Sequence, residues 1–217
     1  MKKTGYFIIL FLLGMAVYFA GGYWAGISHT VRTVLKAVLP VLLFAFSYLC
    51  GRYEPLREWR ETAIALFAAS VGFLFSWILA VPLLEALGIT NESVPGVSLA
   101  KLFDAFFIVV PVLIVARAGG MTTEELYLRR GRLKAWLIIG LSAFTFFIVV
   151  FLLQAGEANL TASRLLGLAP WTLIFIFANA FMEELHFRGL LLKPFERLIG
   201  PHGAVFCIAL FFALTHA

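Results

Sequence analysis

Four ionisable side chains lie close together in one otherwise apolar stretch near the C-terminal end of the chain. They are Glu183, Glu184, His186 and Arg188. On insertion scales, a charged side chain at the centre of a membrane helix costs about 2.5–3.5 kcal/mol. Ionisable groups retained at that cost usually face the interior of a helix bundle and indicate a functional site.

Helical geometry divides these residues between two faces. Residues four apart share a face, so Glu184 and Arg188 predict an ion pair within one helix. If this pair is buried and orders helix packing, breaking it should cost about 3–5 kcal/mol. Glu183 is rotated by about 100° and shares its face with Asn179 and His186. No cation of its own helix neutralises Glu183, which makes it the candidate general base.

Two histidines extend the polar set. His186 is either a core side chain or a polar group beside Glu183. His216 follows another apolar run, and a short connection at residues 194–200 makes its helix an antiparallel neighbour of the helix that carries Glu183. With a rise of about 1.5 Å per residue, Glu183 lies about 14 Å and His216 about 21 Å from the expected helix ends. A small shift of either end would bring both to one depth, where they could activate a water.

The composition is that of a polytopic membrane protein. Of 217 residues, 62% are hydrophobic and 13% are charged, whereas soluble domains are about 45–50% apolar and about 25% charged. The net charge of +5 comes from short basic clusters between apolar runs, which the positive-inside rule explains without a nucleic-acid partner. Cys50 and Cys207 stand among apolar residues and are expected to be small buried side chains.

Seven apolar segments are long enough, or nearly so, for a membrane helix of about 20 residues. They cover residues 6–25, 34–50, 62–87, 98–117, 133–154, 170–192 and 202–217. We therefore expect an all-α fold, a polytopic transmembrane helical bundle of about seven spans with the last one incomplete. The start resembles a signal peptide, but we expect it to be retained as the first span.

The basic residues predict an orientation. Clusters of Lys and Arg precede the first span and follow the second, fourth and sixth, whereas residues 88–97 have none and residues 155–169 have only one. Arg32 and Lys36, placed in the first connection, are the exception. The positive-inside rule then puts the N-terminus in the cytoplasm.

Two basic connections are expected to be structured. Residues 52–61 contain Trp59 among charges, which suits a segment at the membrane surface. Thr122 and Glu125 have the spacing of a capping box, which predicts a short surface helix that ends near Gly131. Neither connection has an arrangement of side chains that indicates chemistry.

Two motifs among the polar residues resemble those of a known family. The sequence EELHFRG at 183–189 resembles the EExxxR motif of the CPBP intramembrane proteases, which include the type II CAAX prenyl endopeptidases and bacteriocin-processing relatives. The sequence FALTH at 212–216 resembles their FxxxH motif. Residues 123–136 resemble a cytoplasmic connection common in bacterial members. The resemblance covers about residues 120–217 and implies a protein of the bacterial plasma membrane.

The resemblance implies a role for each matching residue. Glu183 would be the base that activates a water, and His216 would help to hold that water or a metal. Glu184 and Arg188 would support the site. His186 stands where an aromatic residue such as Phe is usual in the family. The implied reaction is hydrolysis of a peptide bond at or near the membrane surface.

The resemblance also implies surroundings and partners. Use of a divalent metal such as Zn²⁺ is unsettled in the family; Glu183 and His216 would be its ligands here, and two ligands are too few for a zinc site by themselves. The expected surroundings are the lipid bilayer, and the expected substrate is a peptide or protein. Eukaryotic relatives act on prenylated tails, but nothing in this sequence selects for a prenyl group.

The chain is expected to divide into N-terminal transmembrane helices, residues 1–120, and a partial protease core, residues 121–217. The family's third motif, a histidine with Asn, Asp or a similar residue four positions later, does not occur in the core. The last apolar run stops one residue after His216. We therefore expect a C-terminal truncation, with the missing span in the parent protein, and no proteolysis by residues 1–217 alone.

Two other classes of protein fit the same residues. A catalytically inactive scaffold or immunity protein would keep the fold and bind a partner. A proton-coupled transporter would relay protons through Glu183 and His216, but such proteins often show inverted repeats with broken helices, which this sequence lacks. Replacement of Glu183 by Gln separates the classes, because it would abolish proteolysis and leave a scaffold unaffected.

Overall fold

The computed structural model describes residues 2–18, 26, 28–128, 131, 133–157 and 161–216. Within these ranges every regular element is helical, which confirms the predicted all-α class. In chain order the elements are α1 (Lys2–Gly14), α2 (His29–Arg52), the 3-10 helix η2 (Glu54–Trp59), α3 (Arg60–Phe75), the π-helix η3 (Ser76–Ala80), α4 (Val81–Ala86), α5 (Val94–Ala118), α6 (Leu133–Glu157), α7 (Ala162–Glu183), the π-helix η4 (Glu184–Leu192), α8 (Lys193–Ile199) and α9 (Pro201–Thr215).

Among the described residues, four helical segments are long and apolar enough to cross a membrane, as expected of an integral membrane protein. They are His29–Arg52, Glu54–Ala86, Val94–Ala118 and Ser163–Ile199. These four match the predicted second, third, fourth and sixth spans. The helices α6 and α9 lie at the predicted fifth and seventh spans, and α1 lies at the start of the first. The predicted end of the first span, at 19–25, is outside the described residues, and the number of seven spans stays a prediction.

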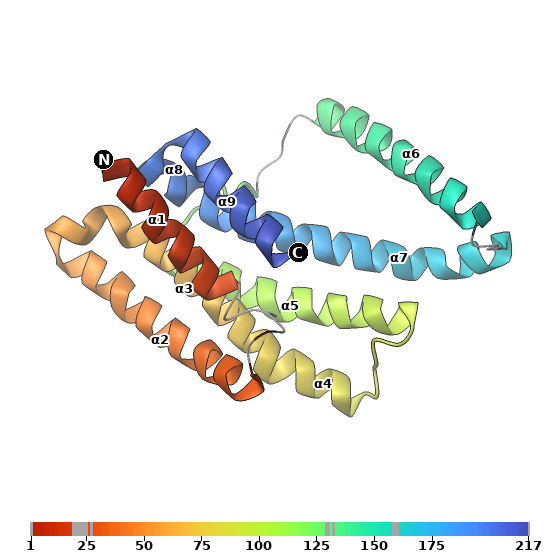
Figure 1. Cartoon of the computed structure of the whole chain (residues 1–217), viewed down its shortest axis with the longest axis horizontal. Coiled ribbons are helices and arrows are strands. Elements are labelled where there is room, and N and C mark those ends of the chain that lie inside the picture. Colours follow the sequence, from red (N-terminus) through yellow and green to blue (C-terminus); the bar gives the residue numbers. More distant parts are fainter. Residues whose placement is uncertain are drawn as a thin grey trace.

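Helix α3 occupies the centre of the bundle. It packs against α2 on one side and α5 on the other, α5 packs against α7, and α1 packs against α8 and α9 (Figure 1). Four alanines of α3 have no exposed surface, and a Cβ at Gly72 would lie 2.9 Å from Val112 Cγ2 of α5. Small residues let helix backbones approach closely, which is how membrane bundles gain packing contacts. The predicted burial of Cys50 and Cys207 is confirmed.

Arg32 and Lys36 lie in α2 and not in a connection, so their predicted placement was wrong. The helix begins early because the Ser28 side chain caps it, accepting a hydrogen bond from the backbone. Lys36 is only 2% exposed. Its Nζ lies 5.4 Å from the ring centroid of Trp77 and 5.8 Å from that of Phe73. These cation–π contacts help to accommodate the buried charge.

The predicted surface helix after residue 121 does not form. The capping box is present in both directions: the Thr122 N–H donates to Glu125 Oε2 at 2.9 Å, and the Glu125 N–H donates to Thr122 Oγ1 at 3.2 Å. The chain then makes only turns, and Tyr127 takes a left-handed φ of 54°. Leu126 is 1% exposed. Burial of Leu126 in the core, rather than growth of a helix towards Gly131, sets the path of this connection.

The last two helices are joined by a single residue. The segment α7–η4–α8 continues to Ile199, past the predicted end at 192, and Gly200 turns the chain with a φ of 83°. Residues with a side chain rarely adopt this conformation. Arg197 fixes α8 by pairing with Glu61 of α3 and, at 3.0 Å, with Glu125. Helix α9 consequently runs back beside η4 (Figure 1).

Gly189 of η4 lies against the backbone of the connection before α6. A Cβ at this position would lie 2.9 Å from the carbonyl oxygen of Leu126 and 3.2 Å from Leu185 Cδ1. Gly189→Ala should therefore lower the free energy of unfolding by about 1–3 kcal/mol through overpacking, measured by thermal unfolding in detergent. The control is Gly140→Ala in α6, where a Cβ meets nothing within 4 Å and alanine favours the helix. Equal stability of both variants would contradict the close contact.

Candidate active site

Glu183 is the last residue of α7, and the helical register changes directly after it. The next residues form the π-helix η4, in which backbone bonds run from i to i+5 rather than i+4 and which is a frequent feature of functional sites. Upstream of the change, Asn179 shares the face of Glu183, and its Nδ2 donates to Glu183 Oε1 at 2.8 Å. This contact is the one that α-helical spacing predicts, and it orients the carboxylate from within its own helix.

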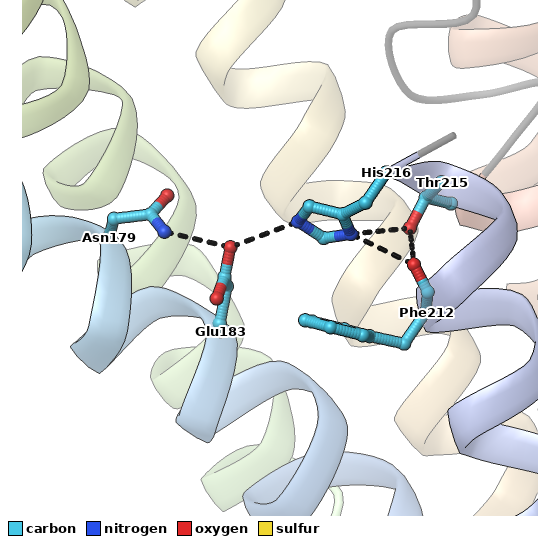
Figure 2. A network of polar contacts seen from close by, with 5 residues as sticks. All are labelled: Asn179, Glu183, Phe212, Thr215 and His216. Atoms are coloured by element: carbon cyan, nitrogen blue, oxygen red, sulfur yellow. Dashed lines mark hydrogen bonds and ion pairs between the residues drawn. The ribbon is translucent and has the colours of Figure 1, made fainter. Parts of the chain in front are cut away.

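His216, the residue that follows α9, reaches across to the same carboxylate. Its Nε2 lies 3.3 Å from Glu183 Oε1 (Figure 2). The two residues come level because the turn lies at Gly200 and not at the predicted helix ends. Glu183 is 17 residues before this turn and His216 is 16 residues after it. The structure therefore brings together the two side chains for which the sequence indicated chemistry.

Phe212 positions His216 in two ways. Its backbone carbonyl accepts a hydrogen bond from His216 Nδ1 at 2.8 Å (Figure 2). Its ring lies beside the imidazole, with centroids 4.3 Å apart and an interplanar angle of 33°. Phe187 of η4 packs edge-on against Phe212 at 4.9 Å. The four-residue spacing of FxxxH thus has a local cause, because only a residue at i−4 presents both carbonyl and ring to the histidine.

The partners of the His216 ring limit the ways in which it can form a hydrogen bond with Glu183. A backbone carbonyl can only accept, so His216 Nδ1 must carry a hydrogen to bond with Phe212. A hydrogen bond between Nε2 and Glu183 Oε1 then requires one further proton, on the imidazole or on the carboxyl group. Without it, two acceptors would face each other at 3.3 Å. The contact is therefore a hydrogen bond only when the imidazole or the carboxyl group carries that proton.

The pair is accessible from outside the protein. The side chain of His216 is 50% exposed and that of Glu183 is 26% exposed. The carboxylate is thus shielded on the side of Asn179 and open on the other.

Glu184 and Arg188 form the predicted ion pair, with Arg188 Nη1 2.7 Å from Glu184 Oε2. The predicted burial of the pair was wrong, because the two side chains are 53% and 63% exposed. The described part of the chain leaves these two side chains largely uncovered, so the cost of breaking a protein-buried pair does not apply. Within the described residues, no hydrogen bond or ion pair links Glu184 or Arg188 to Glu183.

His186 lies in the aromatic core and not beside Glu183. It is 3% exposed, and the rings of Phe73, Tyr18 and Phe187 surround it at centroid distances of 5.3, 5.5 and 6.5 Å. Of the two alternatives, it therefore takes the place of an aromatic core residue. The cause is the π-helical turn, which rotates residue 186 away from the face that it would share with Glu183 in an α-helix.

The donor set at the site is small for a metal. No group of three or more His, Cys, Asp or Glu side chains gathers anywhere in the described part of the chain. Catalytic zinc sites use three protein ligands and leave a fourth position for water. Glu183 and His216 alone do not constitute such a site.

A family model matches the part of the chain that contains these contacts. The family "Type II CAAX prenyl endopeptidase Rce1-like" matches residues 165–217, from within α7 to the end of the sequence. The match supports an assignment of this part of the chain to the CAAX proteases. No curated protein and no solved structure matches it. The apolar helices support an integral membrane protein, and the family match suggests a protease.

Glu183 and His216 should be energetically coupled. A double-mutant cycle of Glu183→Gln and His216→Gln, read as thermal stability in detergent, should give a coupling energy of about 0.5–3 kcal/mol. The matched control is His202→Gln at the start of α9. His202 lies about 21 Å from His216 along the helix, so its effect should add to that of Glu183→Gln. Additive effects in both cycles would contradict the contact.

Proposed function

We propose that this protein is an intramembrane endopeptidase that hydrolyses a peptide bond near the membrane surface through a water activated by Glu183. One observation carries the proposal. Glu183 Oε1 and His216 Nε2 lie 3.3 Å apart across two helices, in an arrangement that holds one proton. The family match to residues 165–217 supports the same reaction class.

In the proposed reaction, Glu183 takes a proton from water as the water oxygen attacks the scissile carbonyl carbon. The tetrahedral intermediate collapses, the carbon–nitrogen bond breaks, and the proton passes to the leaving amine. Protonated His216 stabilises the developing oxyanion, an effect that is strong where bulk water is excluded. Asn179 and Phe212 keep the two groups aligned. The products are a new carboxylate and a new amine.

Glu184 and Arg188 take a supporting role in this proposal. Their ion pair spans the first turn of η4, directly after the proposed base. The pair adds a modest stabilisation to that turn and does not touch the reacting atoms. The substrate is a membrane-associated peptide or protein, and a lipid attached to it would serve as an anchor in the bilayer.

Proteolysis should depend on both members of the pair. Cells expressing the protein from its complete gene should show new peptide termini in their membrane proteins, detected by mass spectrometry. Glu183→Gln and His216→Gln should each abolish these termini at unchanged protein level, whereas His202→Gln should keep them. Unchanged termini in both site variants would exclude the proposed enzyme. Retained partner binding would then indicate a scaffold, and a pH-driven flux would indicate a transporter.

We also propose that the N-terminus and the arginine-rich connections face the cytoplasm of a bacterial plasma membrane. Single cysteines can be introduced into a variant that lacks Cys50 and Cys207. A cysteine at Asn91 should react with an impermeant thiol reagent in intact cells, and a cysteine at Arg57 should react only after permeabilisation. Both positions are exposed in the folded protein. The reverse pattern of labelling would show an inverted topology.

A further inference from the structure

A cavity of about 650 Å³ lies at the far end of the bundle from α4. Its lining comes from the last turns of α2, from η2, from the first turns of α3 and from the end of α5. The volume falls within the range of about 300–1,000 Å³ that is usual for ligand pockets. No residue of α7 or α9 is among those that line it, so it is separate from Glu183 and His216.

Three arginines line this cavity: Arg52 at the end of α2, Arg57 in η2 and Arg60 at the start of α3. All three are exposed. Arg57 has a partner in Glu54 at 3.5 Å, but these two side chains are 73% and 83% exposed, so the pair is weak. Among the described residues, no carboxylate forms an ion pair with Arg52 or Arg60.

The nearest other carboxylates are held by different cations. Glu58 pairs with Lys2 at 3.2 Å, and Glu61 pairs with Arg197 of α8. Both acids therefore neutralise charge on the α1 and α8 side of the bundle and not at the cavity. The cavity keeps an excess of positive charge, which favours an anionic ligand.

The rest of the cavity wall is apolar. Phe44 of α2 and Phe67 of α3 have ring centroids 5.5 Å apart, and Ile64 and Ile114 add aliphatic surface. Phe44 is 58% exposed and Ile114 is 63% exposed, so this wall opens towards the outside of the bundle. A ligand that fits must combine an anionic group with a hydrocarbon chain.

We propose that this cavity binds one anionic phospholipid, with its phosphate against the arginines and an acyl chain along Phe44 and Ile114. The arginines lie where the apolar run of α2 ends and that of α3 begins. Guanidinium groups bind phosphate through paired hydrogen bonds, and basic pockets between membrane helices bind anionic headgroups. The apolar wall distinguishes a lipid from free phosphate.

Gly51 provides a way to fill the cavity. A Cβ at Gly51 would meet only Arg60 Nε, at 3.9 Å, so a larger side chain can enter the space where the lipid chain and headgroup meet. Gly51→Leu should therefore exclude the lipid without a clash in the bundle. The charge variant is Arg52→Gln with Arg60→Gln. Its control is Lys3→Gln with Lys134→Gln, which removes the same charge away from the cavity.

The test is native mass spectrometry of the purified full chain in neutral detergent, titrated with phosphatidylglycerol, phosphatidylcholine or inorganic phosphate. We expect one retained phosphatidylglycerol, at least tenfold weaker binding in Gly51→Leu and in the double arginine variant, and no change in the lysine control. Thermal unfolding verifies that each variant is folded. Equal binding of phosphatidylcholine, full binding by both cavity variants, or displacement of the lipid by millimolar phosphate would each overturn the proposal.

Discussion

The contact between Glu183 and His216 joins the end of α7 to the end of α9, and the arrangement of the site depends on it. The backbone carbonyl of Phe212 accepts a hydrogen bond from His216 Nδ1. The side-chain amide of Asn179 donates one to the Glu183 carboxylate. A polar group inside a helix bundle is costly unless it is paired. Pairing with Glu183 thus helps to fix the position of α9 beside η4.

The π-helix η4 separates residues that a straight α-helix would place together. Glu183 faces α9, the Glu184–Arg188 pair faces the outside, and His186 enters the aromatic core. Gly189 allows the connection before α6 to lie directly on this segment. One change of helical register therefore gives these neighbouring residues three different environments.

The spacing of residues along the sequence predicted the positions of the helices and the contacts within one helix. Apolar runs located the helices, and the i,i+4 rule predicted the contacts of Glu183 with Asn179 and of Glu184 with Arg188. The closeness of Glu183 and His216 followed from a short connection, although the turn itself was placed several residues early. The role of the Phe212 carbonyl was missed, and the spacing of four residues to His216 was the signal that could have revealed it.

The features that sequence reasoning did not predict depend on contacts between distant segments. The π-helical turn has no sequence signature here, and without it His186 appeared to share a face with Glu183. Lys36 looked like a loop residue because its partners, Phe73 and Trp77, lie some forty residues away. The exposure of Glu184 and Arg188 depends on which face of η4 other helices cover. Spacing within one helix cannot show any of these.

The central claim is that Glu183 and His216 act as one unit on one proton. The most direct measurement is the rate of peptide cleavage by the protein and its Glu183→Gln, His216→Gln and doubly substituted variants. If the residues act as a unit, the double variant should be no slower than the slower single variant, because residues that act together lose their effect together. The account would be contradicted if the double variant lost cleavage rate by the product of the two single-variant factors. A single variant that cleaves at the normal rate would also contradict it.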